Sequence, residues 1–130
     1  MTAFDLPSVR EQLEEALEET VRETGCSSVV IASRNGLVMA HGFCPPYEPR
    51  VLASLGVSMI AEAEATAREL NQGDLWHVVL HCARGKVVAC DAGPDAVLIA
   101  LYDPELHLEL ALLGLTDVAR DISKVLEKEA

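Results

Sequence analysis

The chain has 130 residues, a formal net charge of −11 at pH 7 and a hydrophobic content of 50%, with one Trp, two Tyr and two Phe. This length predicts one domain over residues 1–130, the hydrophobic content argues against disorder, and the acidic balance argues against nucleic acid as a partner, because phosphate binding needs clustered Lys and Arg. The apolar runs fall short of the ~18 residues of a membrane span and the N-terminus lacks signal-peptide features, so we expect a cytoplasmic protein without membrane insertion.

Residues 8–24 predict an amphipathic helix, because apolar residues recur at helical spacing between glutamates. Asp5 or Ser8 would cap its start, and Gly25 stands where a helix ends. The glutamates between residues 11 and 23 are expected to form a solvated helix face.

Residues 27–42 predict a hairpin with the two-residue turn Asn35-Gly36, which would leave Arg34 exposed at its tip. That turn fixes four expected strand pairs: Ser33–Val38, Ile31–Ala40, Ala32–Met39 and Val30–His41. Both strands are apolar at nearly every position, so we expect helices to cover both faces of the hairpin.

Residues 43–50 contain three prolines and predict a loop, and residues 51–70 predict a helix that ends at Asn71-Gln72-Gly73. Within this helix, Glu64 and Arg68 are placed for an i,i+4 ion pair. One stripe of the helix is apolar: Leu52, Leu55, Met59, Ala63 and Leu70. Another side consists of small residues that would let a second helix approach closely: Ala53, Ser54, Gly56, Ser58, Ala61 and Ala65.

Three strands are predicted over residues 75–83, 86–92 and 96–102, with turns at Arg84-Gly85 and Gly93-Pro94-Asp95. Such short connections make neighbouring strands antiparallel. Asp103-Pro104 predicts the start of a last helix from about residue 105. The order αββαβββα therefore predicts an α+β fold: a five-stranded antiparallel sheet with the middle helix on one face and the terminal helices on the other.

The residues that could carry chemistry form no recognisable site. His77 and His81 share a strand face but lie ~13 Å apart, too far to share one metal ion. No nucleotide-binding loop motif occurs. The cysteines include no CxxC pair and are expected to be free thiols, with the last two on opposite sheet faces: Cys26, Cys44, Cys82 and Cys90. We therefore expect no catalytic residue, no metal site and no cofactor.

Three segments together resemble the roadblock / dynein-light-chain domain family: VVIASRNGLVMAHG, LASLGVSMIAEAEATAREL and HVVLHCARGKVVACDAGPDAVLIAL. The resemblance covers nearly the whole chain and implies a profilin-like fold. Two features depart from the family pattern, since the first turn is Asn-Gly in place of Asp-Gly and the segment LHLELALLGL is rich in leucine. A bacterial branch of this family acts as a GTPase-activating protein in cell polarity and gliding motility.

The resemblance implies a homodimer, or a heterodimer with a related chain, in which third strands pair edge to edge and middle helices pack across the two-fold axis. The residues independently favour such pairing, because strand 75–83 would be a sheet edge without proline or inward charge. The expected interface residues lie on that strand and on the middle helix: Trp76, Val78, Leu80, Ser54, Ser58, Ala61 and Ala65.

Family members are scaffolds and regulators of Ras-like small GTPases, so the resemblance implies a non-enzymatic protein of this kind. Any stimulation of GTP hydrolysis would act by ordering the GTPase's own switch residues. Arg50, Glu62 and Arg68 of the middle helix are the expected partner-binding residues. The alternative function is a small-molecule sensor domain, which would need a cavity beside the sheet. A cysteine-based or carboxylate-based enzyme is the third hypothesis.

Overall fold

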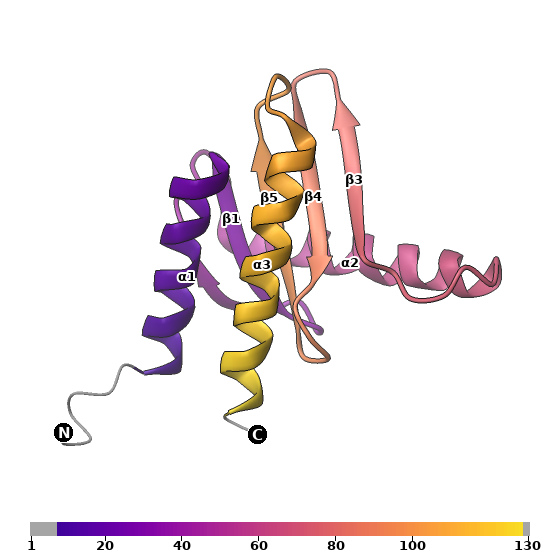
Figure 1. Cartoon of the computed structure of the whole chain (residues 1–130), viewed down its shortest axis with the longest axis horizontal. Coiled ribbons are helices and arrows are strands. Elements are labelled where there is room, and N and C mark those ends of the chain that lie inside the picture. Colours follow the sequence, from indigo (N-terminus) through magenta and orange to yellow (C-terminus); the bar gives the residue numbers. More distant parts are fainter. Residues whose placement is uncertain (1–7, 129–130) are drawn as a thin grey trace.

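The computed structural model describes residues 8–128 and places three helices and five strands in that part of the chain (Figure 1). In chain order they are α1 (Val9–Thr24), β1 (Ser28–Ser33), β2 (Val38–His41), α2 (Pro49–Glu69), β3 (His77–Cys82), β4 (Gly85–Asp91), β5 (Ala96–Tyr102) and α3 (Leu108–Glu127). The predicted order αββαβββα is confirmed. Over the described residues, no helix combines the length and the apolar character that a membrane span requires.

The five strands form one antiparallel sheet in the order β2-β1-β5-β4-β3, so β2 and β3 are its edges. Helices α1 and α3 lie side by side on one face of the sheet, and α2 lies across the other face (Figure 1). This arrangement confirms the predicted fold class and the predicted edge position of the third strand.

Two hydrophobic clusters hold the layers together, one on each face of the sheet. The cluster under α1 and α3 includes Leu17, Ile31, Leu98 and Ile122. The cluster under α2 includes Ile60 from the helix and Ile99 from strand β5. The central strand β5 contributes alternate residues to both clusters, which explains why its sequence is apolar at every position from Ala96 to Leu101.

Helix α1 has the caps that the sequence predicts at its two ends. The Ser8 hydroxyl accepts a hydrogen bond from the Glu11 N–H at 3.1 Å. Gly25 adopts the left-handed conformation with φ of 72° and donates its N–H to the Val21 carbonyl. The other cap candidate, Asp5, lies outside the described residues.

The first hairpin turns over three residues, Arg34 to Gly36, so the predicted two-residue turn is wrong. The Gly36 N–H donates to the Ser33 carbonyl at 2.9 Å, and the Ser33 N–H donates to the Leu37 carbonyl at 2.8 Å. Gly36 has a φ of +88°, which is the position that glycine occupies in three-residue hairpin loops. The expected pairs Val30–His41 and Ile31–Ala40 are present, but a bulge then pairs Ala32 with Val38 in place of Met39 and breaks the Ser33–Val38 pair.

The second hairpin also turns one residue earlier than the sequence predicts. Cys82 pairs with Gly85, so the turn is Ala83-Arg84 and not Arg84-Gly85. Cys82 and Cys90 lie on opposite faces of the sheet, as expected. Cys90 pairs with His77 and shares its face, whereas Cys82 is five residues from His77 along β3 and therefore points to the other face.

The boundaries of α2 and β3 differ from prediction by two residues each. Helix α2 begins at Pro49, because proline suits the first helical position, and this shortens the predicted loop 43–50. Strand β3 begins at His77, so Leu75 and Trp76 precede it. Asn71 and Gly73, both at positive φ, end the α2 region where the sequence predicts an end.

Helix α3 begins at Leu108, three residues after the predicted start, and Asp103 is not its cap. Residues 103–106 form a separate turn, in which the Leu106 N–H donates to the Asp103 carbonyl at 3.2 Å. The buried Lys86 ammonium donates to the carbonyls of Pro104 and Leu106, each at 2.8 Å. These two hydrogen bonds take carbonyls that a helix starting at residue 105 would need.

Candidate interaction surfaces

The outward face of α2 carries small residues along most of its length. Of the small residues noted in the sequence, Ala53 and Gly56 point to the sheet and are buried. A Cβ atom on Gly56 would lie 1.9 Å from Ile99 Cγ1, so the glycine sets how closely the helix approaches the sheet. The four small residues predicted for the dimer interface are all exposed: Ser54, Ser58, Ala61 and Ala65.

The predicted partner-binding residues share this exposed face of α2. Arg50 and Arg68 are eighteen residues apart, which is about five turns at ~3.6 residues per turn, so they lie on the same side near opposite helix ends. Glu62 is also exposed but lies about one third of a turn away from them. Arg50 donates to Glu48 at 2.9 Å. One helix face therefore carries both the expected dimer residues and the expected partner residues.

The peptide groups of β3 that point away from β4 belong to His77, Val79 and His81. The Ala92 N–H donates to the Ala96 carbonyl at 3.0 Å, which makes these two residues a hydrogen-bonded pair between β4 and β5. Bonding alternates along an antiparallel strand, so residues 85, 87 and 89 of β4 bond to β3. Their partners are residues 82, 80 and 78. The three other residues of β3 present their N–H and C=O groups at the open edge.

The side chains of β3 and of the residue before it are unusually exposed for apolar groups. Trp76 is 82% exposed and Leu80 is 43% exposed, whereas Val78 is partly buried against the α2 cluster. Leu80 and Val78 lie on the face that α2 covers. Val78 and Leu80 therefore lie beside α2, whereas Trp76 lines a depression that includes Thr116 of α3.

An open apolar groove of about 630 Å³ runs between α2 and the sheet beside β3. Leu55 of α2 and Tyr47 of the preceding loop are 58% and 50% exposed and line it together with Leu80. Leu55 lies in the groove together with Leu52 and Met59 of the predicted apolar stripe. The buried side of α2 also includes Ala53 and Gly56, which the sequence assigned to the small-residue side.

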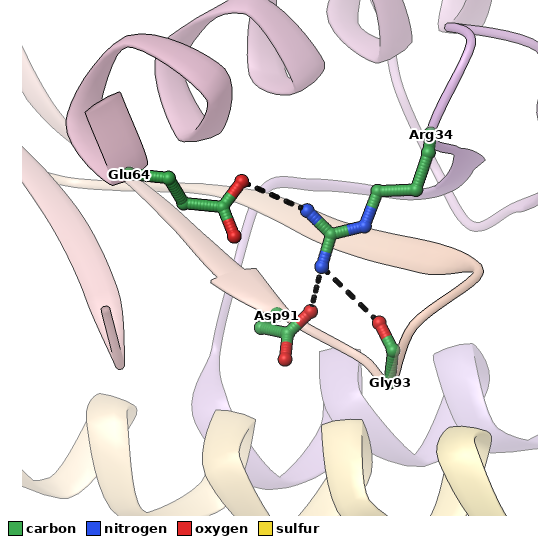
Figure 2. Close-up of polar contacts among 4 residues, drawn as sticks. All are labelled: Arg34, Glu64, Asp91 and Gly93. Carbon is green, nitrogen blue, oxygen red and sulfur yellow. Dashed lines mark hydrogen bonds and ion pairs between the residues drawn. The ribbon is translucent and has the colours of Figure 1, made fainter. Parts of the chain in front are cut away.

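Arg34 is not solvated at the hairpin tip but joins three parts of the chain (Figure 2). Its guanidinium donates to Glu64 of α2 at 3.2 Å, to the Asp91 carboxylate at the end of β4, and to the Gly93 carbonyl at 3.2 Å. The side chain is 31% exposed. Glu64 therefore pairs with Arg34, and the predicted Glu64–Arg68 pair is not formed.

Two carboxylates share the Arg34 guanidinium, and this arrangement changes the acidity of one of them. Burial raises the pKa of Asp91 above its ordinary value of 3.8, and the nearby Glu64 charge acts in the same direction. The Arg34 charge lowers that pKa but does not outweigh burial. The cluster thus links the first hairpin, α2 and the β4–β5 turn through charges at the protein surface.

Three of the four thiols are buried, and burial changes their acidity. Burial raises the pKa of the Cys90 thiol to about 12, and burial also raises the pKa values of Cys26 and Cys44. Cys82 is exposed. Among residues 8–128, no three His, Cys, Asp or Glu side chains of one chain gather closely enough to hold a metal ion.

Sequence reasoning missed two features of these surfaces, and only one had a usable signal. The exposed Leu55 could have been found by noting that the apolar residues of α2 exceed what one buried face accommodates. The Arg34 cluster had no local signal, because its partners lie 30 and 57 residues further along the chain.

Residues 12–102 match the family model described as Roadblock/LC7 domain. One similar protein is the uncharacterized protein MJ1340 of Methanocaldococcus jannaschii, which is 24% identical over 110 residues and is covered over 96% of its length by 85% of this chain.

Two solved structures are similar over almost the full chain. One is described as MglB with tetrameric arrangement; it is 27% identical, with a TM-score of 0.87, over 96% of this chain and 95% of that chain. The other is the gliding protein MglB of Thermus thermophilus; it is 26% identical, with a TM-score of 0.85, over 95% of this chain and 94% of that chain.

Proposed function

Because the chain belongs to the Roadblock/LC7 domain family, we propose that it is a dimeric, non-catalytic regulator or scaffold that binds a Ras-like small GTPase. The likeness to two MglB structures over almost the full chain supports this kind of role. The observation that carries the proposal is the continuous surface formed by the open β3 edge, the apolar groove and the outward face of α2.

In this proposal two copies pair through β3 and bring their α2 helices together. A six-residue edge strand with free peptide groups is suited to pairing with another strand. Pairing would cover Val78, Leu80 and Trp76, and the small exposed residues of α2 would let a second helix approach closely. The apolar groove beside β3 supports a second copy as its occupant, because it is continuous with this edge.

The GTPase would bind the α2 face of the dimer, with Arg50, Glu62 and Arg68 around the contact. In this proposal any stimulation of GTP hydrolysis comes from ordering the GTPase's own switch residues, and the chain itself supplies no nucleophile or base. Because these residues repeat in each copy, a dimer would present two sets of them to a partner.

The test is affinity for a Ras-like GTPase encoded in the same genome, loaded with a GTP analogue and then with GDP, with the mass of each complex measured. We expect preference for the GTP-analogue form with two regulator chains per GTPase. Arg68→Glu should weaken this binding tenfold or more, which corresponds to ~1.4 kcal/mol. The matched control Arg120→Glu, an exposed arginine of α3, should change it less than twofold. A folded dimer that binds neither form would overturn the GTPase part of the proposal.

The apolar groove also favours the second candidate function, a small-molecule sensor. A space of about 630 Å³ is in the range of ligand pockets, and its lining is almost wholly apolar. Melting temperatures recorded across a panel of apolar metabolites test this function. An increase that Leu55→Asp abolishes would support the sensor, and unchanged melting across the panel would count against it.

A further inference from the structure

The edge strand carries two histidines that no function proposed so far uses. His77 and His81 lie on the face of the sheet opposite α2, together with Val79. His77 is partly exposed and His81 is exposed. The peptide groups of both histidines point out of the edge, so any strand that pairs with β3 will lie directly beside them. Within one chain the two residues are ~13 Å apart.

The geometry of self-pairing limits which residues can meet; this step rests on the dimer of the proposed function. A two-fold axis that pairs a strand with its own copy in one antiparallel sheet is perpendicular to that sheet. Residues that face each other across the axis therefore lie on the same side of the sheet. The possible registers are centred on Val79, on Leu80, or further from the middle of the strand.

The register centred on Val79 forms the largest number of hydrogen-bonded pairs along the edge of β3. It places Val79 opposite the partner's Val79, and His77 opposite the partner's His81, so that all three outward-pointing residues of β3 form hydrogen-bonded pairs. Moving the centre by one residue in either direction leaves only two such pairs within the strand. On the α2 side this register pairs Val78 with the partner's Leu80, which buries apolar groups against each other.

This register brings histidines together twice, once on each side of the two-fold axis. In a hydrogen-bonded antiparallel pair the Cα atoms are about 5.5 Å apart and the side chains stand side by side. Two imidazoles at that separation can both reach one ion with Zn–N distances of about 2.0–2.1 Å. On β4, Cys90 pairs with His77 and Lys86 pairs with His81, and the Lys86 ammonium donates to the carbonyls of Pro104 and Leu106.

We propose that His77 of one subunit and His81 of the partner bind a divalent transition-metal ion such as Zn²⁺, giving two sites per dimer. Each site needs both subunits, so the metal stabilises the dimer and a lone chain holds none there. If Zn²⁺ is present at ten times the dissociation constant of each site, two sites strengthen dimerisation by roughly a hundredfold. Water would complete the coordination of an ion with two protein ligands.

The test measures Zn²⁺ binding and dimer affinity at neutral pH, with all proteins carrying Cys82→Ser to remove the exposed thiol. We expect two Zn²⁺ per dimer, and none at these positions for His77→Ala or His81→Ala. Mixing these two variants should restore binding, because a mixed dimer retains one complete site. His41→Ala, on the opposite edge, is the control and should bind Zn²⁺ like the parent protein.

The outcomes distinguish a failure of the metal-site proposal from a failure of the dimer on which it depends. A dimer that takes up no Zn²⁺, or uptake that survives His77→Ala, overturns the metal site and leaves the dimer standing. A monomer at all concentrations overturns the dimer itself. Crosslinking of single introduced cysteines tests the strand register independently. Val79→Cys should form an intersubunit disulfide on oxidation. Preferential crosslinking of Leu80→Cys would overturn the register and the metal site.

Discussion

The two edges of the sheet differ in how well they are protected, and the difference indicates which edge is built to pair. Edge strand β2 has four residues, contains a bulge, contacts both α1 and α2, and leads into a segment with two consecutive prolines. Edge strand β3 has six residues in regular register and is contacted by α2 alone among the described helices. Short length, bulges and covering elements prevent strand addition, so β2 is closed to a partner and β3 is open.

The largest expected effect comes from placing proline at equivalent positions of the two edges. Val79→Pro removes an outward N–H of β3, and on the two-fold axis it does so in both subunits. Two lost hydrogen bonds and the steric conflict should weaken the dimer at least tenfold, measured by analytical ultracentrifugation. The fold should remain, because the β3–β4 ladder does not use this N–H.

The matching control at the other edge is His41→Pro. Gly42 donates its N–H to Val29 at 2.9 Å, so by alternation the His41 N–H points outward from β2. We expect this variant to dimerise like the wild type. Equal weakening by both substitutions would contradict the assignment of β3 as the pairing edge.

A second prediction concerns the helix beside the open edge. Gly56→Ala places a methyl group into Ile99 and should push α2 away from the sheet, at a cost of about 1–3 kcal/mol measured by denaturant unfolding. On the other face, Gly114→Ala meets only the Thr24 methyl group, at 2.6 Å, and gains helix propensity. A smaller cost for Gly56→Ala than for Gly114→Ala would contradict the close helix–sheet contact.

A third prediction tests the charges that connect α2 to the rest of the fold. Arg34→Ala leaves Glu64 and Asp91 facing each other without their cation and should cost about 1–2 kcal/mol at pH 7. Thermal unfolding should shift by several degrees. Arg50→Ala removes a largely solvent-exposed ion pair with Glu48 and should change stability by less than about 0.5 kcal/mol. Equal effects would show that the Arg34 cluster is only a surface contact.

The smallest predicted effect is a pH dependence that comes from Asp91. Burial raises its pKa above 3.8, so the folded protein keeps this proton to a higher pH than the unfolded chain does. The resulting destabilisation is absent below pH 3.8 and complete above the raised pKa. The stability of the wild type relative to Asp91→Asn should therefore fall as pH rises through that interval. A stability difference independent of pH across it would contradict the shift.

The layers of the fold could be predicted from sequence because each element carries its own local pattern. The apolar strands, the glycine after α1 and the proline at the start of α2 each report on their immediate neighbourhood. The predictions fail where residues far apart in the sequence determine the local structure. Lys86 takes two carbonyls ahead of α3 and delays its start, and Arg34 finds partners on α2 and β4 that no local pattern reveals.

The candidate surfaces, like the fold, could be predicted from the sequence only in part. The sequence placed β3 at a sheet edge, and helical spacing placed four small residues of α2 on one exposed side. Ala53 and Gly56, assigned to the same side, instead pack on the sheet. The direction of the β3 peptide groups was not predictable, since it depends on how the strands align. A turn misplaced by one residue at Ala83-Arg84 is enough to change which peptide groups reach the open edge.

The antiparallel packing of α1 against α3 has a practical consequence for measuring any of these interactions. The start of α1 and the end of α3 lie at the same end of the helical layer, on the face of the sheet away from α2 (Figure 1). A sensor chip or a fluorescent label attached beyond either helix would therefore leave α2 unobstructed. Binding curves from protein immobilised at one terminus should agree with those from protein immobilised at the other.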